Sequence, residues 1–314
     1  MITDKVMGKT QQFIINEIEM YDKFIDISDN DSFLKSIRRR SRKLSNYSNK
    51  EVAEYFIKKE ICFNLKGTFT NPEKKYNFNY LMLTKNNYNE LLLSSMFFPK
   101  HFFSFYTAAY VHGLTLNVPR SIYVRQENLK KLPDDREKIL FDQKIVDKSF
   151  TKNPRISNTN VDFFFNNREY KIIKTETQNM DSIGIEQFHY FGNELEVTSI
   201  ERTLIDISVH PHYSGGPGEV LKIFKNAKNK INCVTMAEIF NKYNLKYPYE
   251  RRILFYMKRT GYDRSSVKEF EENVKKNKNL ELKFYLNNQI TQPKLDEKLD
   301  IYYPSYIDNI TEDQ

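Results

Sequence analysis

The sequence predicts an α+β protein with an N-terminal winged-helix-like domain over residues 1–95 and a larger domain over residues 96–314. Three observations predict this fold. Apolar residues recur at helical spacing near the start, short strand-like segments fill the middle third, and helical spacing returns in the last third. The second domain is therefore expected to be mixed α/β with a helical C-terminal part. A chain of 314 residues is long enough for two such cores.

The first domain is expected to contain three helices followed by a hairpin. Ser48 is a suitable cap for the third helix, and Glu51 suits its first turn. Asn71-Pro72-Glu73 supplies turn chemistry between the two strands. These are the parts of a winged helix, in which a helix enters the major groove of DNA. The helices are expected over 11–24, 32–44 and 49–61, and the strands over 65–70 and 77–84.

A dense basic cluster marks the second predicted helix. Phe33, Ile37 and Leu44 lie at helical spacing, so the basic groups would face away from the core. Such a helix could neutralise phosphates along DNA, although a solvated face that keeps the protein soluble has the same appearance. We predict a DNA-binding surface formed by Arg38, Arg39, Arg40, Arg42 and Lys43.

The middle third is predicted to be mixed. A helix over 102–112 ends at Gly113, because glycine suits the left-handed conformation of a C-terminal cap. A polar loop is expected over 152–160. Strands are expected over 121–125, 138–146, 161–165, 171–174 and 187–191.

The last third is predicted to be mostly helical. Thr198 and Glu201 have capping-box spacing, and Leu204 belongs to the buried face of the helix that they open. His210-Pro211 ends this helix, and Pro217 lies near the start of the next one, where proline costs no hydrogen bond. Further helices are expected over 218–227, 235–243, 249–260 and 265–276, with strands over 281–287 and 299–303 around a loop at Pro293.

These later helices carry a second basic group. It could engage a partner protein or the backbone of nucleic acid, and it could equally be solubilising charge. In that second case Arg252 would pair internally with Asp206 or Glu219. The residues of the predicted surface are Lys222, Lys225, Arg251, Arg252, Lys258 and Arg259.

Motifs for catalysis and metal binding are weak. Cys62 and Cys233 are expected to be reduced and buried, and no zinc-type Cys/His spacing exists. The pair His210 and His212 is expected to be structural. Glu281-Leu282-Lys283 has the short form found in metal-dependent nucleases, so a nuclease is the enzyme alternative. The main expectation is a protein without catalytic residues, metal or cofactor.

Charge and hydropathy indicate the environment. The net charge of +8 favours anionic partners. No apolar run is long enough to cross a bilayer, and the N-terminus lacks the pattern of a secretory signal. We therefore expect a cytoplasmic protein without a membrane partner.

Two segments resemble the AbiEi family in order and approximate spacing. The first is S-F-Y-T-A-A-Y-V-H-G-L-T-L-N-V-P-R-S-I-Y at Ser104 to Tyr123, and the second runs from Val197 to Tyr262. The resemblance implies an antitoxin of a type IV toxin–antitoxin, abortive-infection system. Such a protein counters a separately encoded nucleotidyltransferase-like toxin and represses its own promoter by binding operator DNA. A stand-alone transcription regulator or phage-defence component without a toxin remains the alternative within this class.

Overall fold

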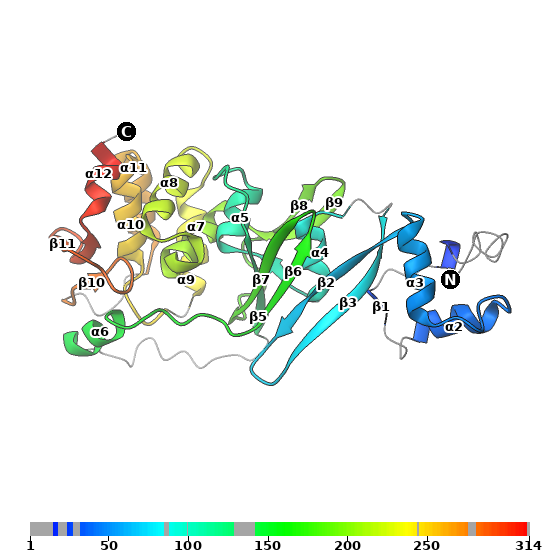
Figure 1. Cartoon of the computed structure of the whole chain (residues 1–314). Coiled ribbons are helices and arrows are strands. Elements are labelled where there is room, and N and C mark those ends of the chain that lie inside the picture. The colour runs from blue at the N-terminus through cyan, green and yellow to red at the C-terminus, as the bar shows by residue number, and fades with distance from the viewer. Residues whose placement is uncertain are drawn as a thin grey trace. The chain divides into compact units, whose positions relative to one another are not determined.

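The computed structural model shows a mixed α+β protein (Figure 1). It describes residues 15–17, 24–27, 32–84, 88–98, 100–128, 142–243, 245–275 and 281–312. The chain forms two compact units. Unit 1 contains Met1–Pro99 and Asn158–Ile173, and unit 2 contains Lys100–Ser157 and Lys174–Gln314. The strand pair within 158–173 therefore belongs with the N-terminal residues. Among the helices of the described residues, none is both long enough and apolar enough to cross a membrane.

Unit 1 is built around antiparallel strands in the order β1-β3-β2-β6-β7. Its helices are α2 (Ser32–Arg40), α3 (Asn49–Lys58) and α4 (Glu90–Phe97). Its strands are β1 (Ile25–Asp26), β2 (Cys62–Thr70), β3 (Lys75–Leu83), β6 (Asn160–Phe165) and the first half of β7 (Arg168–Gln178).

The start of α3 follows the predicted capping box. The Ser48 hydroxyl accepts the Glu51 N–H at 3.2 Å, and the Glu51 carboxylate accepts the Ser48 N–H at 2.9 Å. The predicted hairpin is also confirmed, because the Asn71 side chain accepts the N–H groups of Glu73 and Lys74 in the turn. Leu34 and Ile37 of α2 and Phe56 of α3 are fully buried in one core.

The two helices before α3 differ from expectation. Helix α2 ends at Arg40 rather than at residue 44. Two consecutive turns follow it, closed by backbone hydrogen bonds from Leu44 to Ser41 and from Tyr47 to Leu44. This brings Leu44 into the core from a turn. Of the helix predicted over 11–24, only 15–17 and Phe24 lie within the described residues. The first three are helical, whereas Phe24 precedes β1.

In unit 2 the sheet continues in the order β7-β5-β4-β9-β8, within one nine-stranded sheet of the described chain. Strand β4 pairs antiparallel with β5 and parallel with β9, and α5 (Phe105–Val111) follows β4 directly. Gly113 has φ +64°, which confirms its capping position. The strands are β4 (Phe102–Phe103), β5 (Ser121–Asn128), β8 (Ile185–Tyr190) and β9 (Asn193–Thr198).

A helical layer completes unit 2, with α7 (Ile200–Val209) packed against α5, α8, α9 and α10 (Figure 1). Leu204 and Ile207 are fully buried, as the spacing predicts. Pro217 begins the next helix, also as predicted. The other elements are a 3₁₀ helix (Pro211–Ser214), α6 (Gln143–Phe150), α8 (Pro217–Ala227), α9 (Cys233–Lys242), α10 (Glu250–Arg259), α11 (Arg264–Asn273), α12 (Tyr306–Glu312), β10 (Phe284–Tyr285), β11 (Pro293–Asp296) and β12 (Ile301–Pro304).

Several local predictions in unit 2 are wrong. Phe102 and Phe103, predicted as the start of a helix, form β4, and the helix begins at Phe105. The segment predicted as a strand over 138–146 opens α6 from Gln143 onward, because Asp142 caps the helix and Val146 and Phe150 bury one helical stripe. Residues 138–141 lie outside the described residues. The cap of α7 is Ser199, whose hydroxyl accepts the Arg202 N–H, whereas Thr198 ends β9. Pro293 opens β11 instead of lying in a loop.

Candidate functional site

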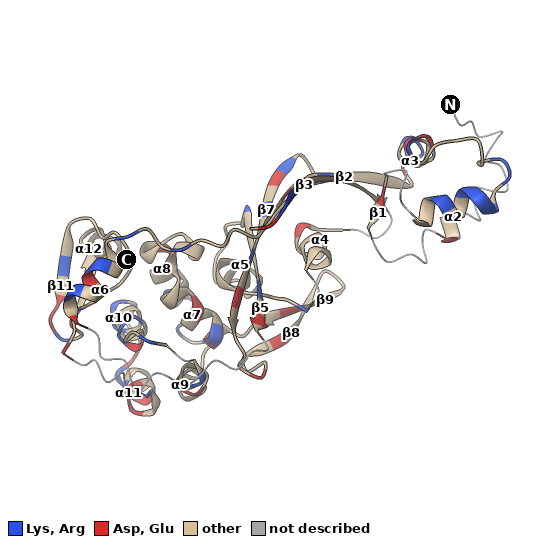
Figure 2. Cartoon of the chain, turned by 90° about the horizontal axis from the view of Figure 1, so that it is seen from below, with Lys and Arg blue, Asp and Glu red and all other residues tan. Residues whose placement is uncertain are grey.

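Exposed cations gather where α2 ends (Figure 2). Arg39, Arg42 and Lys43 are exposed, and within the described residues none of them pairs with an acidic side chain. The partial negative charge at the C-terminus of a helix favours cations in its last turn, so α2 tolerates this density of charge. Arg40 is exposed as well but pairs with Glu17, so these three side chains are the exposed cations of the predicted DNA-binding group that have no acidic partner among the described residues.

The other two predicted arginines on α2 have partners inside unit 1. The Arg38 Nη1 atom donates to Asn49 Oδ1 at 3.0 Å, and Asn49 is fully buried at the start of α3. Arg38 thus ties α2 to α3 and is only partly accessible. The Arg40 Nη2 atom lies 2.7 Å from Glu17 Oε2 and donates to Ser36 Oγ at 3.1 Å. A DNA phosphate would have to compete with these contacts.

The second predicted basic surface is only partly a surface. Lys222, Lys225 and Lys258 are exposed, whereas Arg259 pairs with Asp308 at 2.8 Å. Arg251 and Arg252 are 8% and 1% exposed, which corrects their assignment to a binding surface.

The physical reason for the burial of Arg252 is a set of backbone acceptors. Its guanidinium donates to the carbonyls of Ser208 and Val209 at 2.9 and 3.0 Å. The last carbonyls of a helix have no helical N–H partner, so a buried guanidinium satisfies the end of α7. It also donates to the Tyr285 carbonyl at 2.7 Å. Its hydrogen bonds therefore go to none of the carboxylates that we considered as partners.

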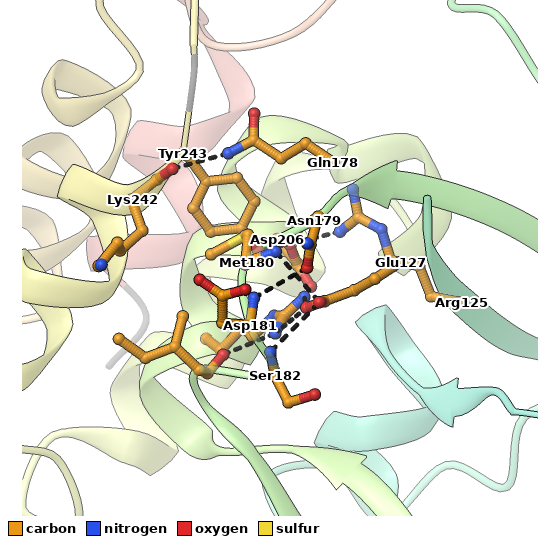
Figure 3. Close-up of polar contacts among 12 residues, drawn as sticks. Arg125, Glu127, Gln178, Asn179, Met180, Asp181, Ser182, Asp206, Lys242 and Tyr243 are labelled. Atoms are coloured by element: carbon orange, nitrogen blue, oxygen red, sulfur yellow. Dashed lines mark hydrogen bonds and ion pairs between the residues drawn. The ribbon is translucent and has the colours of Figure 1, made fainter. Parts of the chain in front are cut away.

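A buried carboxylate on α7 joins β5 and the residue that follows α9 (Figure 3). Asp206 on α7 accepts hydrogen bonds from Arg125 Nη1 on β5 and from the Tyr243 hydroxyl after α9, both at 2.5 Å. Arg125 is 5% exposed and Asp206 1% exposed. Burial, followed by the Asp206 charge, raises the pKa of Tyr243, so the phenol stays a proton donor.

A second carboxylate holds a loop against α7 (Figure 3). The Glu127 Oε1 atom accepts one hydrogen bond from each terminal nitrogen of Arg202, both at 3.1 Å. Its Oε2 atom accepts the backbone N–H groups of Met180 and Ser182 at 3.1 and 3.2 Å. Both oxygens of this carboxylate accept hydrogen bonds from the protein itself, which is typical of a structural rather than a catalytic carboxylate. Spacing in the sequence cannot reveal these contacts, because Glu127 and Arg202 are 75 residues apart.

The histidine pair formed by His210, which precedes the 3₁₀ helix, and His212, which lies within it, is held neutral. Burial lowers the pKa of His212 to about 4, with a further contribution from the Arg252 charge. Burial also places the pKa of His210 well below its ordinary value, assisted by Arg125. The two rings lie 5.6 Å apart, and His210 packs edge-on against Phe105. This is the environment of packed aromatic side chains.

The nuclease-like triplet Glu281-Leu282-Lys283 precedes β10. Glu281 is exposed in a turn before β10, and the Lys283 N–H donates to Gln143 Oε1 at 2.8 Å. In the part of the chain that the structure describes, no three His, Cys, Asp or Glu side chains form a group that could hold a metal ion.

An open cleft of about 380 Å³ lies beside α5 and α8. Tyr106, Tyr123 and Tyr213 line it together with Arg120 and Glu219. The Tyr106 hydroxyl donates to Glu219 Oε1 at 3.1 Å. Val118, which also lines the cleft, is 44% exposed, and the neighbouring loop residue Leu116 is 94% exposed. Residues from both 104–123 and 197–262 line this cleft.

Comparisons with known proteins bear on the fold alone. No family model matches the chain, and no curated protein matches it. The crystal structure of the RV2827C protein from Mycobacterium tuberculosis is similar with a TM-score of 0.56. The match covers 98% of this chain and 94% of that chain at 7% sequence identity. At this identity the similarity concerns the arrangement of elements.

Proposed function

We propose that the chain is a cytoplasmic DNA-binding antitoxin that represses its own promoter through unit 1 and counters a nucleotidyltransferase-like toxin through unit 2. The observation that carries the DNA-binding part is the order of elements in unit 1. Strand β1 precedes α2 and α3, the β2–β3 hairpin follows them, and β3 pairs with both β1 and β2. A winged helix has this order and this pairing, and its helix pair binds duplex DNA.

Electrostatics support the same surface. Arg39, Arg42 and Lys43 extend from the end of α2 and the turn before α3, next to the helix that would enter the groove. Cations in that position can neutralise phosphates and release counterions, which makes binding favourable and dependent on salt. Unit 1 would therefore hold DNA through α2 and the turn that follows it.

Replacing Arg39, Arg42 and Lys43 together with Ala tests this proposal. Each lost phosphate contact lowers the salt slope of log K by about 0.9, so we expect a slope about 2.7 smaller and weaker binding to the promoter. Mobility shifts over a range of salt concentrations measure both quantities. The matched control replaces the exposed Lys222, Lys225 and Lys258 of unit 2 with Ala, which removes the same charge. Equal slopes for wild type and the unit 1 variant would contradict DNA binding by this surface.

The antitoxin part rests on the resemblance to the AbiEi family. Its two segments contribute Tyr106 and Glu219, among others, to one cleft in unit 2, so they belong to one folded region. That region is our candidate for the toxin contact, together with the exposed Lys222 at its side. The alternative is a regulator without a toxin. A neighbouring open reading frame that encodes a nucleotidyltransferase would favour the antitoxin, and its absence would favour the alternative.

A further inference from the structure

The outer side of α3 presents three charged side chains in a single stripe. Lys50, Glu54 and Lys58 are exposed and follow one another at four-residue spacing, which places them on one side of a helix. The other side of α3 packs into the core of unit 1 through Val52 and Phe56, which are both fully buried. The stripe is therefore the part of α3 that a partner can reach.

Neighbouring polar residues at the start of α3 are already occupied. Glu51 closes the capping box with Ser48, and Asn49 accepts the Arg38 guanidinium. Lys50 and Glu54 contact each other only weakly, with Nζ and Oε1 4.0 Å apart and side chains 78% and 63% exposed. Exposed ion pairs of this kind contribute little stability, so both groups can exchange this contact for another partner.

A carboxylate on a DNA-facing helix restricts the DNA that it can accept. Phosphates repel it, and the amino group of cytosine is the donor in the major groove that pairs best with it. A lysine in the same groove donates to O6 and N7 of guanine. Four residues of helix advance by about 6 Å, close to the rise of two base pairs at about 3.4 Å each.

We infer that Lys50 and Glu54 select the operator sequence. Lys50 would read a guanine, Glu54 would read a cytosine about two base pairs away, and Lys58 would contact a phosphate. This inference rests on the proposed function, because it requires unit 1 to bind duplex DNA with α3 in the major groove. Beyond DNA binding itself, the inference assigns to Lys50 and Glu54 the base that each one recognises.

Selection from a randomised duplex library with the full-length protein tests the inference. We expect wild type to enrich a G·C pair at two positions about two steps apart, with substitutions there weakening binding roughly ten- to a hundred-fold. Lys50→Ala should lose the guanine preference. Glu54→Gln should exchange cytosine for adenine at its position, because an amide pairs with adenine through N6 and N7.

Lys58→Ala is the matched control on the same stripe. It should weaken binding to all sequences alike and leave both base preferences unchanged, since a phosphate contact carries no sequence information. All three positions are exposed, so circular dichroism should show the wild-type fold. A Glu54→Gln variant that binds DNA with the wild-type base preference would overturn the inference and leave DNA binding intact. A wild-type protein that binds no duplex DNA would overturn the proposed function itself.

Discussion

Three buried arginines of unit 2 differ in their hydrogen-bond acceptors, which include a carboxylate in two cases and are backbone carbonyls in the third. Arg125 pairs with Asp206, Arg202 pairs with Glu127, and Arg252 donates to carbonyls at the end of α7. Removing one partner of a buried ion pair leaves an uncompensated charge, which typically costs about 3–5 kcal/mol. The sequence shows Arg251 and Arg252 as a basic pair on a helix and contains no signal of the acceptors that bury Arg252. Those acceptors come from other elements, so only the tertiary structure reveals its role.

The buried histidines should make stability depend on pH. In the unfolded chain His212 titrates near its ordinary value of 6.5, whereas in the folded protein its pKa is about 4. Between these values the unfolded state binds more protons, so stability falls as the pH falls through this window. We expect the melting temperature of wild type to decrease between about pH 7 and about pH 5.

His212→Asn should reduce that decrease, because one group that titrates differently in the two states is lost. The residual slope would come from His210, whose pKa is lowered in the same direction. His189→Asn is the control, since the side chain of His189 is 78% exposed. Melting curves of His212→Asn that shift with pH as much as those of wild type would show that this histidine does not contribute.

At the scale of single elements, the sequence predicts where a helix or turn begins when the contacts that fix that position lie within a few residues of it. The capping box of α3, the Asn71 turn and Pro217 at the start of α8 follow from neighbours in the sequence. Strand and helix were confused at α6, because its short apolar stretch fits both periods and its buried stripe depends on packing elsewhere. The winged-helix assignment and the DNA-binding role of α2 stay predictions.

Ser48→Ala tests the cap that positions α3. Loss of a serine cap costs typically about 1 kcal/mol, which corresponds to roughly fivefold faster opening of the helix. Hydrogen exchange of the α3 amides should therefore accelerate by about that factor, most clearly at Glu51, whose N–H donates to Ser48. Ser45→Ala, at an exposed hydroxyl in the preceding turn, is the control and should leave α3 unchanged. Unchanged exchange at Glu51 would mean that the capping box contributes little.

At the scale of the whole molecule, the division into units has a consequence for truncation. The sequence predicts a boundary after residue 95, whereas unit 1 also includes the later segment Asn158–Ile173. Strand β6 in that segment pairs with β2, so a cut near residue 96 would leave β6 with an open edge. Open edges favour association with other chains. Sequence alone could not indicate this insertion, because pairing between β2 and β6 joins residues that are far apart in the chain.

A cleaner fragment follows from the ends of the inserted segment. The Ser157 hydroxyl donates to the Lys174 carbonyl, so residues 100–157 can be joined to 174–314 through a short glycine linker. If neutralisation resides in unit 2 and DNA binding in unit 1, this fragment should fold, lose promoter binding and still protect cells from the neighbouring toxin. Thermal melting, mobility shift and growth on co-expression measure the three properties. The fragment 100–314 is the comparison, and we expect it to aggregate more readily because it retains β6 without β2. A folded, soluble fusion that gives no protection would contradict this division and would assign neutralisation to unit 1 or to control of transcription.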